Sequence, residues 1–340
     1  MTAVERSPAI YDRALADGIQ FQEGELYLPD LHLWLDSRRR RLRAFVSHAH
    51  TDHMAAHRLS FLTDCTERFF HQRMGRRATV AIPFHEPRPL AQSTIEFIPA
   101  GHILGSAQLL ITDPAGRRLV YTGDFKLRAR PGVEPGDVVQ ADVVIMEATY
   151  GHPRWRFQDR AFLEQQLVSA IERAFDRGKQ PIVLAYALGK AQEALCLLSR
   201  HGLRVAVHAS VAEYLPTYEA YGTVFGPYEA LDLDAVEGRV LLVPMGCHRT
   251  APFRAMAATY TIFLSGWGLD PRSKYRYGVD EVLPLSDHAD FDELVEYVEG
   301  SRARRVYTVH GSADFARYLS TQGIEAYHLP DHQPSLFDSL

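Results

Sequence analysis

Four side chains that can bind a metal ion lie within six residues of one another in the segment SHAHTDHM, residues 47–54. They are His48, His50, Asp52 and His53, and an apolar stretch precedes them. Imidazole nitrogen suits zinc and its neighbours, and a carboxylate can hold a metal or orient water beside it. Burying four such groups without a cation would carry a large desolvation cost. The cluster therefore predicts a loop that supplies ligands to two adjacent metal ions.

Two further candidate ligands follow apolar stretches later in the chain. His102 lies in IPAGHILGS between two glycines, where the backbone can turn tightly. Asp124 lies in LVYTGDF, and a carboxylate at this position could bridge two metals about 3.5–4 Å apart, as two-metal hydrolysis requires. Either residue alone would be compatible with an ordinary turn. Together with the loop, they are predicted ligands of a binuclear site.

The first 150 residues are dominated by short apolar segments that end in Gly, Pro, Asp or His, which is typical of strands and turns. The predicted strands cover residues 31–36, 43–49, 93–100, 107–113, 118–124 and 142–149. This pattern predicts stacked sheets, with the candidate ligands at the ends of strands.

From Pro153 onward, helices and strands alternate. Apolar residues at helical spacing predict a helix over 159–177, which Gly178 would end. The elements predicted after it are strand 181–188, helix 190–199 and strands 204–210, 239–245 and 261–266. This alternation indicates an α/β unit with a largely parallel sheet. After Leu283 a strand followed by a helix occurs twice more, with His288 and His310 at the two junctions.

Length and composition limit the possible architectures. A chain of 340 residues exceeds what one hydrophobic core usually supports, so we expect two packed units or one domain interrupted by another. No stretch approaches the roughly 20 apolar residues that cross a bilayer, which argues against a membrane protein. The first residues carry charges where a signal peptide would have an apolar run, so we expect a cytoplasmic protein.

Cysteines and charge add little positive evidence for a function. Cys65, Cys196 and Cys247 are odd in number and widely spaced, which argues against a disulfide framework and a structural zinc site. The net charge of −5 gives no global attraction to nucleic acid, although bound cations would add positive charge. The most basic run, residues 38–41, is more typical of a solvated turn than of a binding site.

The ordered ligands, with Asp36 ending an earlier strand, resemble the motif set of metallo-β-lactamase-fold hydrolases. Later segments resemble motifs of the β-CASP branch of that superfamily, whose members are nucleases acting on DNA or RNA; these segments are Met146–Gly151, Ala187–Glu193, Ser265–Trp267, Ser286–His288 and Val309–Gly311. The resemblance implies an α/β fold, an αββα sandwich of residues 1–151 and 285–340 interrupted by an α/β β-CASP cap over residues 152–284.

The resemblance also implies how two divalent ions, zinc or manganese, would be held. The ligands implied for one metal are His48, His50 and His102. Those implied for the other metal are Asp52, His53 and His310. Asp124 would bridge both ions, and Asp36 would orient the ligand loop from behind. Met54 stands where a glycine is common in the family, which removes no ligand.

The catalytic residues implied by the resemblance are Asp52, Glu147 and His288. Glu147 would pair with His288, and His288 would protonate the departing sugar oxygen while metal-activated water attacks the phosphate. From the sequence alone, His288 could instead be a helix cap or a structural histidine. The side chains expected to contact substrate are Lys190, Ser265, Trp267 and Ser286.

The choice between DNA and RNA rests on two opposed features. His310 resembles the RNA-processing members, because DNA-repair members typically carry an apolar residue there. The compact chain with its YALGKAQE helix resembles bacterial DNA-ligase-associated exonucleases, which are also labelled messenger-RNA 3′-end processing factors. We favour a DNA exonuclease that acts on single strands or strand ends in DNA repair, with a DNA ligase and a helicase as partners by resemblance.

Two alternatives stay open at this point. One is an RNA-processing nuclease of the messenger-RNA 3′-end type. The other is a small-molecule hydrolase of the same fold, although a small substrate would not need the long insert between Glu147 and His288.

Overall fold

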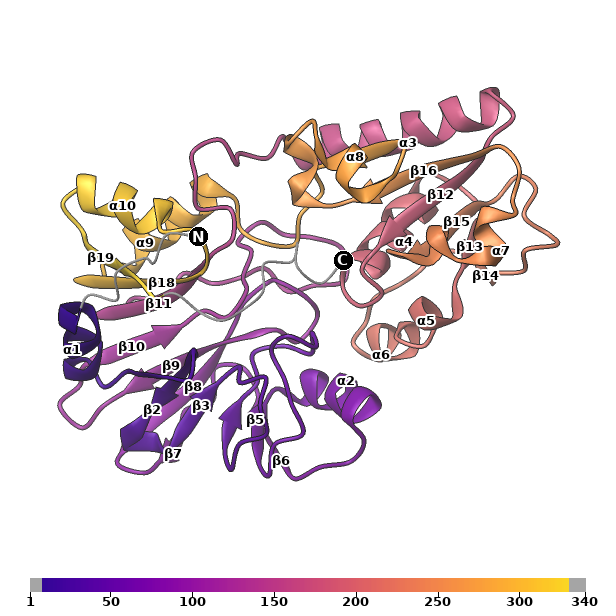
Figure 1. The fold of residues 1–340 in the computed structure, drawn as a ribbon. Coiled ribbons are helices and arrows are strands. Elements are labelled where there is room, and N and C mark those ends of the chain that lie inside the picture. The colour runs from indigo at the N-terminus through magenta and orange to yellow at the C-terminus, as the bar shows by residue number, and fades with distance from the viewer. Residues whose placement is uncertain (1–7, 330–340) are drawn as a thin grey trace. The chain divides into compact units, whose positions relative to one another are not determined.

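The computed structural model describes residues 8–329. Residues 1–7 and 330–340, the ends of the predicted first domain, lie outside the described residues. The chain divides into two compact units (Figure 1). The first unit consists of the chain up to Arg128, Glu134–Arg154 and the chain from Ala289 onward. The second unit consists of Ala129–Val133 and Trp155–His288, whereas the predicted insert covers residues 152–284.

The first unit begins with helix α1 (Pro8–Ala16) and a six-stranded sheet in the order β1-β2-β3-β4-β5-β6. The strands are β1 (Gln20–Gln22), β2 (Glu25–Leu28), β3 (Leu33–Leu35), β4 (Ala44–Phe45), β5 (Ser60–Leu62) and β6 (Thr79–Ala81). The first two pairings are antiparallel, and the pairings from β3 to β6 are parallel. Helix α2 (Asp64–Met74) follows β5 and contacts β6.

A seven-stranded sheet completes the strands of the first unit, in the order β19-β18-β11-β10-β9-β8-β7. Its strands are β7 (Arg88–Leu90), β8 (Ser93–Pro99), β9 (Ala107–Thr112), β10 (Arg118–Tyr121), β11 (Val143–Ala148), β18 (Arg305–Gly311) and β19 (Glu325–His328). Strand β11 pairs in parallel with β18, with Val143 opposite Arg305. This pairing brings β18 into the sheet in which β10 leads to Asp124 and β11 contains Glu147.

Alternation along the strands of the larger sheet gives the first unit two cores. Ile145 on β11 and Leu109 on β9 belong to the core shared with the smaller sheet, together with Leu35 and Phe45. Their neighbours Val144 and Leu110 point to the opposite face. That face is covered by residues of α9 (Phe291–Ser301) and α10 (Asp314–Thr321), drawn in yellow beside β18 and β19 in Figure 1. The stacked sheets and flanking helices agree with the predicted sandwich.

The second unit has a six-stranded sheet whose pairings are all parallel, in the order β14-β13-β15-β12-β16-β17. The strands are β12 (Gln180–Ala185), β13 (Val205–Val207), β14 (Tyr228–Ala230), β15 (Val240–Pro244), β16 (Thr259–Leu264) and β17 (Glu281–Leu283). The helices of eight or more residues are α3 (Arg160–Asp176) and α4 (Lys190–Arg200), and the shorter ones are α5 (Ala209–Ala212), α6 (Leu215–Ala220), α7 (Ala251–Arg254) and α8 (Ser273–Tyr277). The parallel α/β architecture agrees with the sequence prediction.

Both faces of this parallel sheet are buried, which explains its nearly continuous apolar strands. Val183 and Ala185 of β12 face the core that α3 and α4 cover. Ile182 and Leu184 face a second core that contains Phe253 of α7 and Tyr277 of α8. Among the described residues, no helix is both long and apolar enough to cross a membrane.

Candidate metal centre and active site

Three histidine nitrogens of the first unit converge on one point. His50 Nδ1 lies 3.1 Å from His48 Nε2 and 3.1 Å from His102 Nε2. Ligands at about 2.0–2.1 Å from a tetrahedral zinc stand about 3.3 Å apart, so this spacing suits one ion with three imidazole ligands. His48 and His102 are fully buried, and His50 is partly exposed. The geometry fits the predicted first metal position.

A second group of possible ligands contains His53, Asp124 and His310, whose donor atoms all lie within 4.8 Å of one another. Asp124 Oδ2 lies 3.1 Å from His53 Nε2. The same oxygen lies 3.7 Å from His48 Nε2 and 3.7 Å from His102 Nε2. One carboxylate oxygen therefore lies near both groups, a position that is compatible with the predicted bridging role of Asp124.

Asp52 occupies the open side of this cluster. Its Oδ2 lies 3.9 Å from His53 Nε2, and its side chain is 41% exposed. The neighbouring His53 side chain is 2% exposed. Asp52 can therefore meet both a cation held at His53 and water that enters with substrate, which suits its predicted double role as ligand and catalytic residue.

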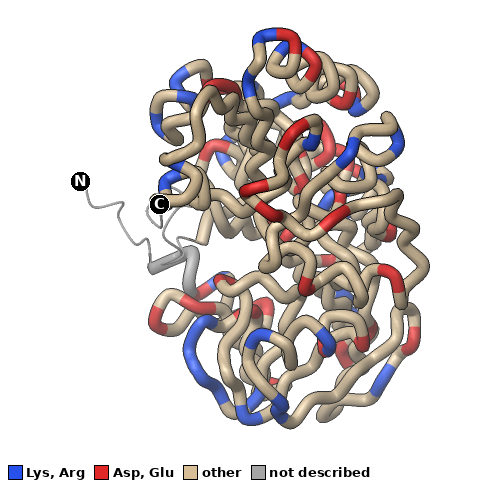
Figure 2. Tube along the Cα trace, turned by 90° about the vertical axis from the view of Figure 1, so that its right-hand side faces the viewer, with Lys and Arg blue, Asp and Glu red and all other residues tan. Residues whose placement is uncertain are grey.

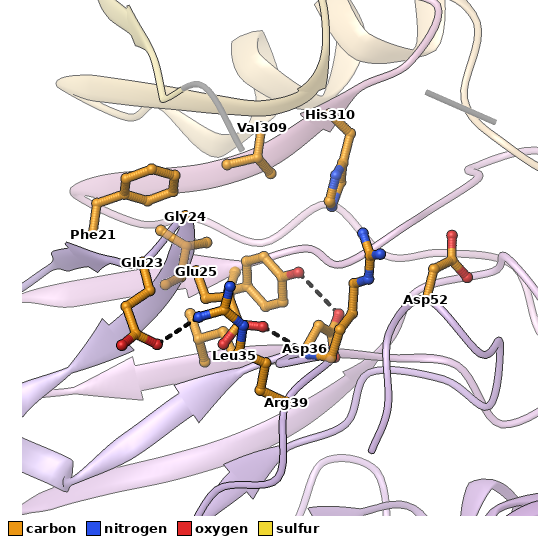
Figure 3. A pocket seen from close by; sticks show the side chains of 13 residues that line it. Phe21, Glu23, Gly24, Glu25, Leu35, Asp36, Arg39, Asp52, Val309 and His310 are labelled. Carbon is orange, nitrogen blue, oxygen red and sulfur yellow. Dashed lines mark hydrogen bonds and ion pairs between the residues drawn. The ribbon is translucent and has the colours of Figure 1, made fainter. Parts of the chain in front are cut away.

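Asp36 holds the ligand loop from behind. Its carboxylate accepts hydrogen bonds from Ser47 N (2.7 Å), Ser47 Oγ (2.6 Å) and the Tyr121 hydroxyl (2.9 Å), and its Oδ2 lies 2.9 Å from His53 Nδ1. These contacts fix the ring of His53 with Nε2 toward Asp124. Asp36 has a positive φ of 44°, a strained conformation that surrounding bonds can hold at functional sites. Figure 3 shows Asp36 with its contact to the tyrosine.

Sequence reasoning did not single out Ser47 and Tyr121. Besides bonding Asp36, Ser47 Oγ lies 2.9 Å from His48 Nδ1, so Ser47 supports two ligands. Tyr121 is 1% exposed at the end of β10, three residues before Asp124. Their positions in the sequence could have indicated a role at the site, since Ser47 adjoins the first histidine and Tyr121 ends the strand that leads to Asp124.

Two glycines permit the tight turns that bring the later ligands to the loop. Gly123 has a φ of 55°, and a Cβ on it would lie 2.7 Å from the side chain of Ser47. Gly101 has a φ of 77°, and a Cβ on it would lie 2.0 Å from the Lys126 carbonyl oxygen. A side chain at either position would displace Asp124 or His102, so these turns are part of the site.

The buried histidines differ in their proton affinity. Burial, reinforced by the neighbouring histidines, holds the pKa of His48 well below its ordinary value. Burial also lowers the pKa of His53, but the carboxylates of Asp124 and Asp52 outweigh it and hold that pKa well above the ordinary value. His48 is therefore ready for a cation at neutral pH, whereas a cation at His53 must displace a proton.

This difference predicts that the two metals leave at different pH. As pH falls, protons compete first at His53, so the ion held by His53, His310 and Asp124 should dissociate before the ion held by three histidines. Metal content measured after dialysis from pH ~8 to pH ~5 should fall in two steps, with a plateau near one ion per chain. Loss of both ions in a single step would contradict the assignment.

Glu147 lies fully buried at the end of β11 in the first unit. One carboxylate oxygen accepts a hydrogen bond from Phe125 N at 2.8 Å, and the other accepts one from Thr149 Oγ1 at 2.6 Å. These bonds join Glu147 to the residue after Asp124. The predicted partner, His288, belongs to the second unit, so their pairing stays a prediction.

Lys190 begins α4 in the second unit and is 1% exposed. Its Nζ donates to Asp287 Oδ1 at 2.6 Å and to the Leu285 carbonyl at 3.1 Å. Burial lowers the pKa of Lys190, and the charge of Asp287 opposes this effect. This environment favours a role in holding the segment before His288 over the predicted contact with substrate.

The other predicted substrate contacts also lie in the second unit. Ser286 is 4% exposed, and its Oγ accepts a hydrogen bond from His288 N at 3.0 Å. Ser265 is 3% exposed and accepts one from Trp267 N at 3.4 Å. Trp267 is partly exposed and meets Trp155 edge to face, with ring centroids 5.0 Å apart. The two serines shape their own loops, and Trp267 offers the most accessible surface of the four.

Replacing Lys190 with methionine is expected to destabilise the protein by about 3–5 kcal/mol, because it removes the cation nearest a buried carboxylate. Denaturant unfolding would measure the loss. Adding Asp287→Asn to Lys190→Met should recover part of the stability, since the buried charge is then also removed. Additive losses in the double variant would show that the two side chains do not interact.

Comparison with known proteins agrees with this geometry. Residues 274–330 match the family model described as the Zn-dependent metallo-hydrolase RNA specificity domain. A protein from Opitutus terrae named a probable DNA ligase is 38% identical over 312 residues, which cover 91% of this chain and 31% of that protein. An RNase J-like protein of Methanocaldococcus jannaschii is 33% identical over 121 residues, or 35% of this chain and 28% of that protein.

A solved structure supports the fold independently. The crystal structure of a protein of unknown function from Enterococcus faecalis matches with a TM-score of 0.58 at 15% identity, covering 80% of this chain and 76% of that one. Together with the ordered ligands, these similarities place the chain in the β-CASP family of the metallo-β-lactamase fold. The chain spans about a third of the length of the curated relatives described above.

Proposed function

We propose that this protein is a metal-dependent phosphodiesterase that trims single-stranded DNA or DNA ends in repair. The observation that carries the proposal is Asp124 Oδ2, which lies 3.1–3.7 Å from the ligand nitrogens of both histidine groups. These two groups would hold two divalent cations, zinc or manganese, and such a pair would supply the chemistry of phosphodiester hydrolysis.

The cations, when bound, supply positive charge against the phosphate and lower the pKa of a water molecule. The protein supplies the remaining functions. Asp52, exposed beside His53, accepts a hydrogen bond from the attacking water and orients it. His288 donates a proton to the departing sugar oxygen, and Glu147 keeps that imidazole protonated. The buried contacts of Asp36 and Ser47 hold the ligands in place through each cycle.

The similarity to a protein named a probable DNA ligase supports DNA as the substrate, because it extends over 91% of this chain. It also supports a DNA ligase as a functional partner, with a helicase added by family resemblance. The second candidate is RNA. The family model that matches residues 274–330 is described as an RNA specificity domain, and another relative is named RNase J-like.

The test is to incubate the purified protein with Mn²⁺ or Zn²⁺ and end-labelled DNA and RNA strands of matched sequence. Stepwise shortening of DNA, lost in Asp52→Ala, is the expected result. Cleavage of RNA alone would replace DNA by the second candidate. Full activity in Asp52→Ala would overturn the mechanism, and intact strands of both kinds would overturn the nuclease assignment.

A further inference from the structure

A cavity of about 270 Å³ lies in the first unit directly beside the metal centre. Asp36, Asp52 and His310 line it, so the cavity and the metal centre share residues. Figure 3 shows Asp52 and His310 toward one side of this cavity and Phe21 and Glu23 toward the other. A group bound in the cavity could therefore belong to the same strand as a phosphate held at the metals.

The walls of this cavity combine apolar and charged side chains. The apolar part comes from the β1–β2 hairpin, the end of β3 and the end of β18, and consists of Phe21, Leu26, Leu35 and Val309. The charged part includes Arg38 and Arg39, which lie in the basic run described above. Such walls suit a group with an apolar ring and an anionic attachment. The volume is about the lower limit for ligand pockets, which fits one nucleoside and excludes a duplex.

The basic run forms a turn that specific side-chain contacts hold in place. The guanidinium of Arg41 lies 3.5 Å from the ring centroid of Trp34 on β3 and donates to Glu25 Oε2 at 2.5 Å. The side chain of Arg41 is 16% exposed, and that of Glu25 is 13% exposed. Ser37 Oγ also donates to Glu25 at 2.5 Å. These contacts anchor both ends of the turn to the first sheet.

The middle of the turn borders the cavity. Arg38 N donates to Glu25 Oε1 at 3.0 Å, which fixes the backbone from which the exposed Arg38 side chain extends. Arg39 Nη1 donates to Glu23 at 2.7 Å, a pair in which both side chains are more than half exposed. Arg40 is exposed and is absent from the cavity lining. The anchored backbone therefore presents Arg38 to the cavity and Arg40 to solvent.

We propose that Arg38, held by the turn of residues 37–41, is a phosphate-binding side chain for the nucleic-acid strand. Arg38 contacts the phosphate next to the scissile one, the cavity receives the nucleoside attached to it, and Arg41 positions the turn. The planar guanidinium can bind two phosphate oxygens at once. This inference rests on the proposed nuclease function and deepens it, since it assigns a strand contact to a run that the sequence alone indicates as a solvated turn.

Charge explains why such a contact is needed. The cavity lining carries four carboxylates, Glu23, Glu25, Asp36 and Asp52, which would repel a phosphate on their own. Glu23 and Glu25 are bonded to Arg39 and Arg41, and Asp36 is bonded to Ser47 and Tyr121. Arg38, which lines the same cavity as Asp52 and His310, gives the strand a positively charged side chain to approach.

The test compares Arg38→Ala with Arg40→Ala, a matched arginine in the same turn. Binding of a fluorescent single-stranded DNA oligonucleotide is measured by anisotropy in EDTA at several salt concentrations. Steady-state cleavage with Mn²⁺ gives KM and kcat. Arg38→Ala should weaken binding about 5–10-fold and reduce the salt slope by about 0.7, the value for one phosphate contact on a single strand. Arg40→Ala should change binding less than about twofold, and Arg38→Lys should keep the salt slope.

The possible outcomes distinguish a failure of the proposed role of the turn from a failure of the proposed nuclease function. Equal binding and equal KM for Arg38→Ala and Arg40→Ala, in a wild-type background that binds or cleaves DNA, would overturn the role of the turn alone. A wild-type protein that neither binds nor cleaves the strand would overturn the proposed function itself. Arg41→Met should raise KM as Arg38→Ala does, and wild-type KM in a folded Arg41→Met variant would remove the positioning role.

Discussion

Asp124→Ala is expected to abolish phosphodiester hydrolysis and to leave at most one metal ion per chain. Asp124 Oδ2 lies within 3.7 Å of ligand nitrogens from His48, His53 and His102. Removing it takes away the ligand that two cations would share and the negative charge that would offset their repulsion. Because the metal pair contributes several kcal/mol to transition-state stabilisation, the loss in kcat should be about 10³-fold or more.

Two measurements test this expectation together. Metal content by mass spectrometry of the purified variant should fall below that of the wild type, and DNA cleavage should be lost. Asp176→Ala provides a matched control, because Asp176 is an exposed aspartate on α3. The control should keep both the metals and the activity. Two tightly bound ions and normal cleavage in Asp124→Ala would show that the bridge is not needed.

The metal ligands could be predicted because each follows a strand or lies in one dense cluster. The HxHxDH pattern places its ligands in a single loop, and the strand ends before His102 and Asp124 indicate which residues meet at the edge of a sheet. The structure shows why this works, since β4 contains only Ala44–Phe45 and the predicted strand over 43–49 ends early. The chain leaves the sheet before Ser47, which frees the histidines to turn toward one another.

Contacts between distant segments could not be predicted from local pattern. Lys190 lies 97 residues from Asp287, and the sequence does not indicate that the lysine is buried on that carboxylate. The turn at Arg38 is similar, because a run of four arginines has the composition of a solvated loop. Trp34 on β3 and Glu25 on β2 give it a defined geometry through their contacts with Arg41. Charge in the sequence predicts exposure, but partners in the structure decide which charges are buried.

His288→Ala is expected to lower kcat on DNA about 10²–10⁴-fold while both metals stay bound, because a general acid contributes about that factor. His288 follows the Ser286 turn and the Lys190–Asp287 ion pair, whose hydrogen bonds hold the backbone here and do not involve the imidazole. Loss of the ring should therefore leave the fold intact. The decline in rate at high pH, where the acid loses its proton, should disappear with the variant.

Two substrates with different leaving groups can show whether His288 acts as a proton donor. A sugar alkoxide is a poor leaving group and needs a proton, whereas p-nitrophenolate leaves readily without one. His288→Ala should therefore lose little activity on bis(p-nitrophenyl) phosphate while losing most of its activity on DNA. Equal losses on both substrates would mean that His288 holds the strand or the site. His201→Ala, an exposed histidine of the same unit, should retain activity on both and so exclude a general effect of removing an imidazole.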